Sequence, residues 1–478
     1  MTDRDHYSSP LAERYASKAM LGLWSHQTRY GLWRELWLAL AEAQKELGVD
    51  IPSEAIAEMR AHLADIDFAA VAAYEKKFRH DVMAHVHAFA DVAPAARKVI
   101  HLGATSAFVT DNADVILMRR GMEILRGRII EALRSLAAFA REWKNEPTLG
   151  STHLQAAQPT TVGKRATLWM QDLVLDLADL DIRIETLPCR GVKGTTGTQA
   201  SFLEIFEGDH QKVRQLDRIV TEKIGFKSSI PVSGQTYTRK LDAQVLGVVA
   251  GIAASASKFS GDMRVLQAIG EMEEPFEKEQ IGSSAMAYKR NPMRAERIAS
   301  LARFVISLEP NANLTHSVQY FERTLDDSAN RRLSIPESFL ATDAILILMN
   351  NIVGGLEVHP ARIRRRLMDE LPFMATEELI VRSVRAGGDR QEAHEIIRRH
   401  SIAAAQAVKH EGAANDMLER LAADKQFNVS MADMKSLLDP KRFIGRAPQQ
   451  VDEFLAEVVD PILAGSKAPA PAREEVRV

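Results

Sequence analysis

Long runs of apolar residues at helical spacing constrain the fold of this chain more than any other feature. Between residues 115 and 140 apolar side chains return every third or fourth position, and the pattern continues for roughly thirty residues to Pro147. Comparable patterns cover 161–187, 237–266 and about 317–353, with a kink expected at Pro336. Alternating strand patterns are nearly absent. The sequence therefore predicts an all-α fold built around a bundle of long helices.

Changes in helix length along the chain predict three domains. Residues 1–105 are interpreted as an N-terminal helical domain, 106–358 as the central long-helix bundle, and 359–478 as a C-terminal helical domain with a disordered tail from about 465. The apolar stripes of the central helices are broader than one neighbouring helix covers, and small residues such as Gly247 and Ala254 permit close approach. The breadth of these stripes favours a bundle that also packs with copies of itself, and a bundle within one chain is the alternative.

Composition argues against several classes of protein. The 478 residues are 46% hydrophobic and 26% charged with a net charge of -3, so neither nucleic acid nor a membrane surface is expected as a partner. No run of eighteen apolar residues predicts a membrane-spanning helix, and the charged first six residues do not resemble a secretory signal. The single cysteine, Cys189, favours a reducing, cytoplasmic setting and has no histidine near it in sequence to activate it.

The stretch from Ile281 to Glu296 gathers several chemically active side chains. Gly282 beside Ser283 and Ser284 favours a mobile loop, and Pro292 suits the first position of a helix. The N-terminus of such a helix offers free N–H groups to a carboxylate or phosphate. On the residues alone, a serine-rich surface loop and a functional loop are equally open interpretations.

Two histidine-containing stretches could also carry chemistry. His153 lies among small polar residues at an expected helix start, where a histidine can titrate near neutral pH, although a capping or core histidine is the alternative. His80, His85 and His87 lie close together in sequence. A metal site is not favoured there, because no cysteine and no His-x-x-x-His pair accompanies them.

Two further segments contain residues suited to binding anions. Residues 191–198 are rich in glycine but have neither the Walker nor the dinucleotide-binding spacing, so they are interpreted as a connection in the central domain. Residues 321–332 are crowded with arginines and hydroxyl groups, which suits a phosphomonoester. A solvated charged face is the alternative for this second segment.

Taken together, these stretches resemble the fumarase/aspartase superfamily, and among its members most closely the adenylosuccinate lyases. Residues 283–291 are similar to the superfamily loop Ser-Ser-x-Met-Pro-x-Lys-x-Asn, and 152–158 to its Thr-His-x-Gln-Pro-Ala-Gln motif; Ala287 and Ala156 stand where those patterns have proline. The segments that resemble adenylosuccinate lyases in particular are Arg79-His80-Asp81, Gly234-Gln235-Thr236 and Arg323 to Arg332. The resemblance covers nearly the whole chain.

The resemblance implies a non-oxidative β-elimination that needs neither cofactor nor metal. Adenylosuccinate would give fumarate and AMP, and SAICAR would give fumarate and AICAR, in purine nucleotide biosynthesis. Ser283 is expected as the base, His153 as the general acid, and Lys289 as a group that stabilises the developing charge. Glu296 is expected to orient His80 or another histidine. A homotetramer with each site shared by three subunits is also implied.

The residues implied for catalysis are Ser283, His153, His80, Lys289 and Glu296. The residues implied for substrate binding are Arg14, Tyr15, Arg79, His80, Asp81, Thr105, Ser106, Gln235, Asn291, Arg297, Arg323, Ser328 and Arg332. Two alternatives remain open at this stage. One is another lyase of the superfamily, such as argininosuccinate lyase or fumarase, whose substrates carry no phosphate. The other is a structural protein with a retired site, against which the retention of Ser283, His153 and Lys289 argues.

Overall fold

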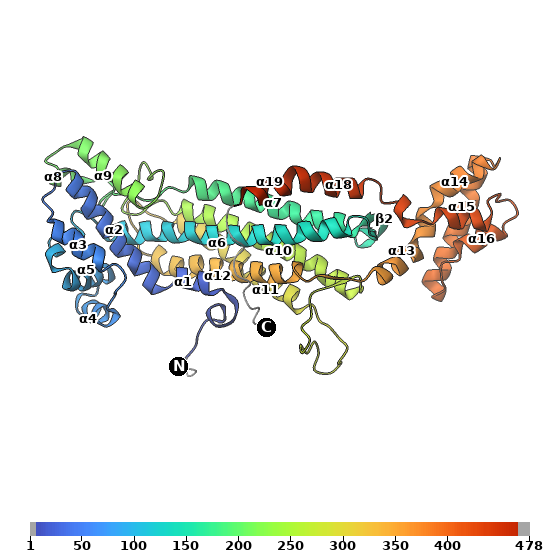
Figure 1. Cartoon of the computed structure of the whole chain (residues 1–478), viewed down its shortest axis with the longest axis horizontal. Coiled ribbons are helices and arrows are strands. Elements are labelled where there is room, and N and C mark those ends of the chain that lie inside the picture. Colours follow the sequence, from blue (N-terminus) through green and yellow to red (C-terminus); the bar gives the residue numbers. More distant parts are fainter. Residues whose placement is uncertain (1–5, 467–478) are drawn as a thin grey trace.

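The computed structural model describes residues 6–466 and confirms the prediction of a mostly helical chain. The molecule is elongated, with groups of short helices at both ends of a long bundle (Figure 1). The disordered tail predicted from about 465 lies, beyond residue 466, outside the described residues.

Long helices form the central bundle, and their apolar faces make one continuous core. They are α6 (Ser106–Trp143), α7 (Val162–Thr186), α10 (Lys240–Ala268), α11 (Met293–Ser317) and α12 (Asp327–Val353). The three long patterns predicted from residues 115, 161 and 237 are confirmed as helices, and the first of these helices begins earlier than predicted, at Ser106. Pro336 lies inside α12 without ending it.

The fourth predicted helix, from about Ser317 to Val353, begins ten residues too early. α11 ends at Ser317, and residues 318–326 form a loop before α12. The Gln319 side chain explains the break, because it accepts the Arg239 N–H at 2.9 Å and donates to the Tyr237 carbonyl at 3.0 Å. These bonds dock the loop on the segment before α10, and Phe321 interrupts the helical backbone with a φ of 46°.

The N-terminal end of the molecule combines two parts of the sequence. It contains η1 (Leu11–Tyr15), α1 (Lys18–Leu23), α2 (His26–Glu46), α3 (Ser53–Ala61), α4 (Phe68–Phe78), α5 (Asp81–Val92) and η2 (Pro94–Ala96), together with α8 (Ala200–Ile205) and α9 (His210–Lys223). α9 packs on α2 (Figure 1). Helices from the middle of the sequence therefore complete the structure around the first hundred residues.

The opposite end holds a separate group of short helices with its own apolar core. They are α13 (Pro360–Met374), α14 (Thr376–Arg385), α15 (Arg390–Gln406), η3 (Ala407–Glu411), α16 (Met417–Ala423), α17 (Met431–Leu437) and η4 (Pro440–Arg442). The chain then returns to the bundle through α18 (Ala447–Phe454), η5 (Leu455–Val459) and α19 (Asp460–Gly465). These last helices pack on α6 and α7 (Figure 1), whereas the sequence grouped them with 359–446.

A β-hairpin replaces the helix start predicted around His153. β1 (Pro147–Thr152) pairs antiparallel with β2 (Gln155–Thr161), and His153 and Leu154 form its tip with φ of 54° and 58°. Gly150 permits the close pairing, because a Cβ there would lie 2.2 Å from the Gln158 carbonyl oxygen. The helix starts only after Thr161, whose side chain caps α7. β3 (Met272–Glu273) and β4 (Glu357–Val358) form a second short ladder.

Two helices of the described chain, α10 and α12, are long and apolar enough to cross a membrane by length and composition. In the most apolar 18-residue segment of each helix, 56% of α10 and 72% of α12 is buried within the bundle, as in core helices of a folded domain.

Candidate active site

The N-termini of four helices meet at the N-terminal end of the bundle. α5, α6 and α12 are joined there by two contacts: the His80 Nε2 lies 3.4 Å from the Ser106 hydroxyl, and Arg332 pairs with Asp81 at 3.2 Å. Just before α10, the Gln235 amide donates to the Thr105 hydroxyl at 3.2 Å. Helix N-termini carry free N–H groups and a positive dipole end, so this cluster suits an anionic ligand.

The cluster brings together residues that are far apart in the sequence and were expected in one site: His80, Asp81, Thr105, Ser106, Gln235 and Arg332. The His80 side chain caps α5, with Nδ1 accepting the Met83 N–H at 3.4 Å. In the neutral ring that bond leaves the proton on Nε2, which faces the Ser106 hydroxyl. The His80 side chain is 46% exposed, so a ligand can reach it.

A buried ionic network holds these helix N-termini in place. Arg239 pairs with Asp111 of α6 at 3.2 Å and with Asp327 of α12 at 2.7 Å, and all three side chains are at most 4% exposed. Arg331 pairs with Asp242 of α10 at 2.7 Å. Arg323, which is expected to bind phosphate, lies 3.6 Å from Asp327. The network therefore fixes the frame on which the predicted ligand-binding residues stand.

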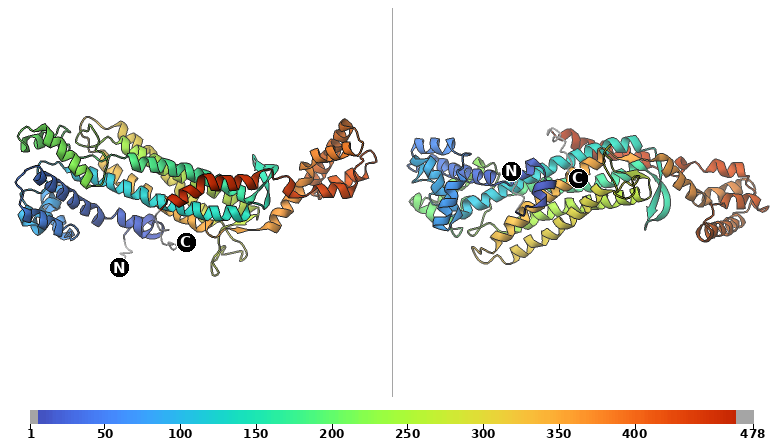
Figure 2. Two further views of the ribbon diagram at one scale, coloured as in Figure 1. Left: turned by 45° about the horizontal axis from the view of Figure 1, so that its top comes forward. Right: turned by 90° about the horizontal axis from the view of Figure 1, so that it is seen from below.

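The predicted catalytic loop lies between β3 and α11 and projects from the bundle (Figure 2). The Ser283 hydroxyl oxygen accepts the N–H of Ala285 at 3.3 Å and of Met286 at 3.1 Å. The Asn291 amide donates to the Gly282 carbonyl at 2.6 Å, which closes the loop on itself. N–H groups aimed at a serine oxygen stabilise negative charge on that oxygen.

The remaining predicted residues lie at other places on the chain. The Arg297 guanidinium lies 5.3 Å from the Tyr15 ring centroid, which brings η1, with Arg14, against α11. Glu296 is exposed in the first turn of α11, and its contact with a histidine stays a prediction. Ser328 lies in the first turn of α12, and Arg79 ends α4 in a left-handed conformation one residue before His80.

One chain does not bring the predicted acid and base together with the anion-binding cluster. His153 lies exposed at the tip of the β1–β2 hairpin, near α13 and α18, whereas His80 begins α5 at the other end of the molecule (Figure 1). The Ser283 loop occupies a third place between them. If these residues act in one site, that site contains residues of more than one chain.

Comparison with known proteins shows the family to which the chain belongs. A family model described as lyase matches residues 4–307, and one described as adenylosuccinate lyase C-terminus matches 372–454. An adenylosuccinate lyase of Saccharomyces cerevisiae is 52% identical over 463 residues, covering 96% of both chains. One from Schizosaccharomyces pombe is 49% identical, covering 98% of both. The chain belongs to the adenylosuccinate lyase family.

Solved structures of more distant proteins share the fold. A fumarate lyase of Mesorhizobium sp. BNC1 has a TM-score of 0.77 at 24% identity, over 96% of this chain and all of that one. A 3-carboxy-cis,cis-muconate lactonizing enzyme of Pseudomonas putida has a TM-score of 0.81 at 21% identity, over 95% and 99%. Membership of the adenylosuccinate lyase family confirms the resemblance seen in the sequence, while the roles of individual residues stay predictions.

The sequence patterns did not predict the buried ionic network beneath the candidate site. Its members are Asp111, Asp114, Tyr237, Arg239, Asp242, Asp327 and Arg331. Charged residues within otherwise apolar helical patterns were the available signal, since such residues are buried only when paired. Their partners could not be inferred, because Arg239 and Asp111 are 128 positions apart.

We expect Asp111→Ala to lower the free energy of unfolding by about 3–5 kcal/mol, because the buried Arg239 guanidinium loses the Asp111 carboxylate that it pairs with. Asp111 also accepts the Tyr237 N–H at 2.9 Å, and that bond is lost too. Urea denaturation measures the change. Asp50→Ala, an exposed aspartate in the loop between α2 and α3, is the matched control and should stay within about 0.5 kcal/mol of the unaltered protein. Equal effects of the two substitutions would contradict the assignment.

The other histidines near the N-terminal end pack rather than react. His85 lies 4.0 Å from the Tyr30 ring, and burial lowers its pKa to about 4. His87 stacks on Phe78 at 4.6 Å. Burial likewise raises the pKa of the Cys189 thiol to about 11, so this thiol is not suited to act as a nucleophile.

His101 makes stability depend on pH. Its Nδ1 accepts the Trp37 N–H at 2.9 Å, and burial lowers its pKa from 6.5 to about 4. The unfolded chain therefore takes up this proton below pH 6.5, while the folded chain does so only near pH 4. The stability that the neutral ring contributes is present above pH 6.5 and is lost as the pH falls toward 4.

We expect His101→Asn to flatten the fall of the melting temperature between pH 6.5 and 4, because an amide does not titrate. Asparagine also tolerates the positive φ of 68° at this position. Circular dichroism melts at several pH values measure the slope. His153→Asn, an exposed histidine that also has a positive φ, is the matched control and should leave the slope unchanged. An unaltered slope in His101→Asn would contradict the prediction.

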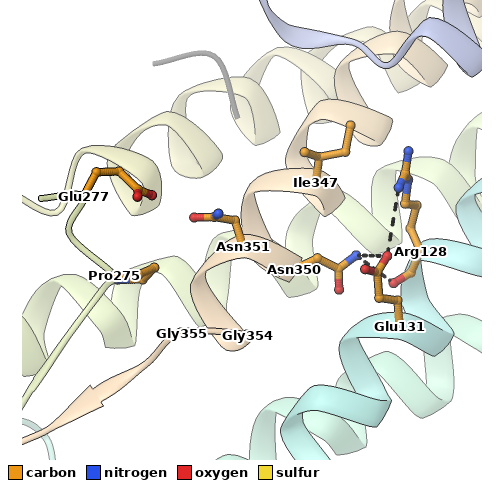
Figure 3. Close-up of a pocket in the computed structure, with 9 residues that line it drawn as sticks. All are labelled: Arg128, Glu131, Pro275, Glu277, Ile347, Asn350, Asn351, Gly354 and Gly355. Carbon is orange, nitrogen blue, oxygen red and sulfur yellow. Dashed lines mark hydrogen bonds and ion pairs between the residues drawn. The ribbon is translucent and has the colours of Figure 1, made fainter. Parts of the chain in front are cut away.

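A pocket opens between α6, α12 and the chain just before the Ser283 loop (Figure 3). The Asn350 amide donates there to the Arg128 carbonyl at 3.0 Å and to Glu131 at 3.3 Å. None of the residues expected in the site lines this pocket. The pocket is therefore separate from the cluster of helix N-termini.

Proposed function

We propose that the protein catalyses the elimination of fumarate from adenylosuccinate, giving AMP, and from SAICAR, giving AICAR. The 52% identity to the Saccharomyces cerevisiae adenylosuccinate lyase over 96% of both chains carries the proposal. The cluster of helix N-termini around His80, Ser106 and Gln235 supports it, because both substrates carry a phosphate and carboxylates.

The reaction requires that a proton beside a carboxylate be removed and that a C–N bond break. We infer that Ser283 takes the proton as an alkoxide, which the N–H groups of Ala285 and Met286 and the ammonium of Lys289 would stabilise when the loop closes. Lys289 and Asn291 would stabilise the charge that develops on the carboxylate. His153 would protonate the leaving nitrogen. Glu296 would orient a histidine by a charge-assisted hydrogen bond.

Arginines and hydroxyl groups would hold the anionic ends of the substrate. Ser328 and Arg332 lie in the first two turns of α12, and Arg323 lies in the loop just before it, so the positive end of the helix dipole lies beside them. We infer that these residues and Arg297 bind the phosphate and the succinyl carboxylates, with help from Arg14, Tyr15 and Arg79. Thr105, Ser106 and Gln235 would position the succinyl part. Asp81, paired with Arg332, would fix that guanidinium.

The working assembly is proposed to be a homotetramer in which three subunits contribute to each site. On α7, Leu168, Leu175 and Ile182 are 51–59% exposed at seven-residue spacing, so they form one apolar stripe. On α10, an added Cβ at Gly247 or Gly261 would meet no atom within 4 Å, which leaves room for another helix to approach closely. The separation of His153, Ser283 and His80 within one chain supports shared sites.

The partners proposed are thus the two small-molecule substrates and other copies of the chain, with no role for nucleic acid or membranes. A cytoplasmic location is proposed because Cys189, the single cysteine of the sequence, is buried and free.

The direct test is to mix the purified protein with adenylosuccinate, follow ultraviolet absorbance and assay fumarate. Fumarate and AMP in equal amounts would support the proposal. No turnover would overturn it, and argininosuccinate and malate tried on the same preparation would then distinguish a sibling lyase from a fold without activity. SAICAR as the second substrate tests the other half of the proposal.

A further inference from the structure

The loop from Phe276 to Pro292 has one arm that is firmly attached to the bundle. Glu274 caps α11 by accepting the N–H groups of Arg294 and Ala295, both at 3.0 Å. The buried Arg294 guanidinium donates to the Pro275 carbonyl and pairs with Glu277 at 3.2 Å. By contrast the tip is open to solvent, with Ile281 79% exposed. The base of the loop is therefore held on the bundle, whereas within the described chain its tip is free of such contacts at Ile281.

Arg290 attaches the other arm of the loop. Its Nη1 lies 3.2 Å from the Glu273 carboxylate and 3.0 Å from the Glu357 carboxylate. Glu273 and Glu357 face each other across the β3–β4 ladder, so one guanidinium bridges both strands. The guanidinium also lies 5.0 Å from the Phe276 ring centroid. The Arg290 carbonyl in turn accepts from the Gln267 amide of α10 at 3.0 Å.

Arg290 is placed where its anchoring decides the position of the predicted reacting groups. It lies between Lys289 and Asn291 in the chain, and a Cβ on Gly282 would lie 2.2 Å from the Lys289 carbonyl oxygen. The two arms of the loop therefore touch immediately beside Ser283. A shift of the second arm would move Ser283, Lys289 and Asn291 together, and a misplacement of about 1 Å is enough to cost roughly 10²-fold in rate.

We propose that Arg290 is a positioning residue. Its bridge to Glu273 and Glu357 fixes the second arm of the loop, so that Ser283 and Lys289 are correctly placed relative to each other when the tip closes. This inference rests on the proposed function. The proposed role does not require Arg290 to touch the substrate, because its guanidinium contacts the β3–β4 ladder and the Phe276 ring.

The same contacts argue against a metal site at this place. Glu273, Glu357 and His359 offer ligand atoms within 4.8 Å of one another, but the Arg290 guanidinium already pairs with both carboxylates. As partly exposed pairs, with 41% of the Arg290 side chain accessible, these contacts contribute little to global stability. The expected effect of breaking them is therefore local to the loop.

The kinetic test uses Arg290→Gln, Arg290→Lys and Glu357→Gln. We expect Arg290→Gln to lower kcat by roughly tenfold or more with KM nearly unchanged. Arg290→Lys should recover part of the loss, because an ammonium reaches one carboxylate but cannot bridge two. Glu357→Gln should lower kcat less, and Arg290→Gln/Glu357→Gln no further than Arg290→Gln alone. Arg398→Gln, which breaks an exposed pair with Glu395 on α15, is the matched control and should change nothing.

Hydrogen exchange on the substrate-free protein tests the same inference without using activity. We expect the amides of residues 282–291, including the Lys289 N–H that bonds to the Met286 carbonyl, to exchange several-fold faster in Arg290→Gln than in Arg398→Gln. Unchanged exchange would overturn the inference even in an active enzyme. A rise in KM in Arg290→Gln, with no effect of Glu357→Gln, would overturn it in favour of direct substrate contact. An inactive wild-type protein would contradict the proposed function alone, because the exchange comparison stands without turnover.

Discussion

Ser283→Ala is expected to reduce kcat on adenylosuccinate by about 10³-fold, within the range typical for removal of a general base. The hydroxyl oxygen of Ser283 accepts two backbone N–H groups, from Ala285 and Met286, so the loop is already arranged to stabilise charge on that oxygen. The loss should appear in kcat and in kcat/KM alike, because the base acts in the transition state rather than in binding. Steady-state kinetics on the purified variant measure both.

Ser284→Ala is the matched control, since it makes the same change one position along the same exposed loop. It should retain activity within a few-fold of the unaltered protein. The melting temperature and the oligomeric state should be the same in both variants, because the tip of the loop contributes no buried contacts. An active Ser283→Ala protein would remove Ser283 from the role of base.

The parts of the fold that follow from local pattern could be predicted from the sequence. α6, α7 and α10 were predictable because an apolar side chain every third or fourth residue is a property of each helix by itself. The hairpin around His153 was not, because it depends on the pairing of Gly150 with the Gln158 backbone rather than on alternation of side chains. The loop after Ser317 was missed for a similar reason, since Gln319 finds its partners in the segment before α10.

The candidate site divides in the same way. Ser283, Lys289 and Asn291 lie in one short stretch, so their association was visible in the sequence. The buried ionic network that joins α6, α10 and α12 was not visible in the sequence, because Arg239 pairs with Asp111 across 128 positions. Nor could the sequence place α18 and α19 on the central bundle, since their apolar faces fit any partner with an apolar face. The resemblance to adenylosuccinate lyases linked separate stretches of the sequence whose contacts the local patterns do not reveal.

Mixing two inactive variants should restore activity if sites are shared between subunits. We expect Ser283→Ala and His153→Ala each to be inactive alone and, after dissociation and reassembly at equal amounts, to recover about one quarter of the unaltered activity. A site is active only when one chain contributes an intact Ser283 and another chain contributes an intact His153. If these are different chains drawn at random, each condition holds in half of the cases, so about one quarter of the sites are intact. Fumarate release after reassembly measures the recovered fraction.

The decisive control pairs two changes within one loop. Ser283→Ala mixed with Lys289→Ala should recover nothing, because Ser283 and Lys289 lie on the same loop and therefore come from the same chain at any site. If Ser283→Ala with His153→Ala also stays inactive, while size-exclusion chromatography shows that the subunits have exchanged, both residues act from one chain. The tip of the β1–β2 hairpin would then have to reach the Ser283 loop of its own subunit. However, β2 packs against α13 and α18, and the Ser283 loop projects from the bundle (Figure 2). Recovery would instead assign His153 and Ser283 to different subunits, which the separation of the two residues within one chain favours.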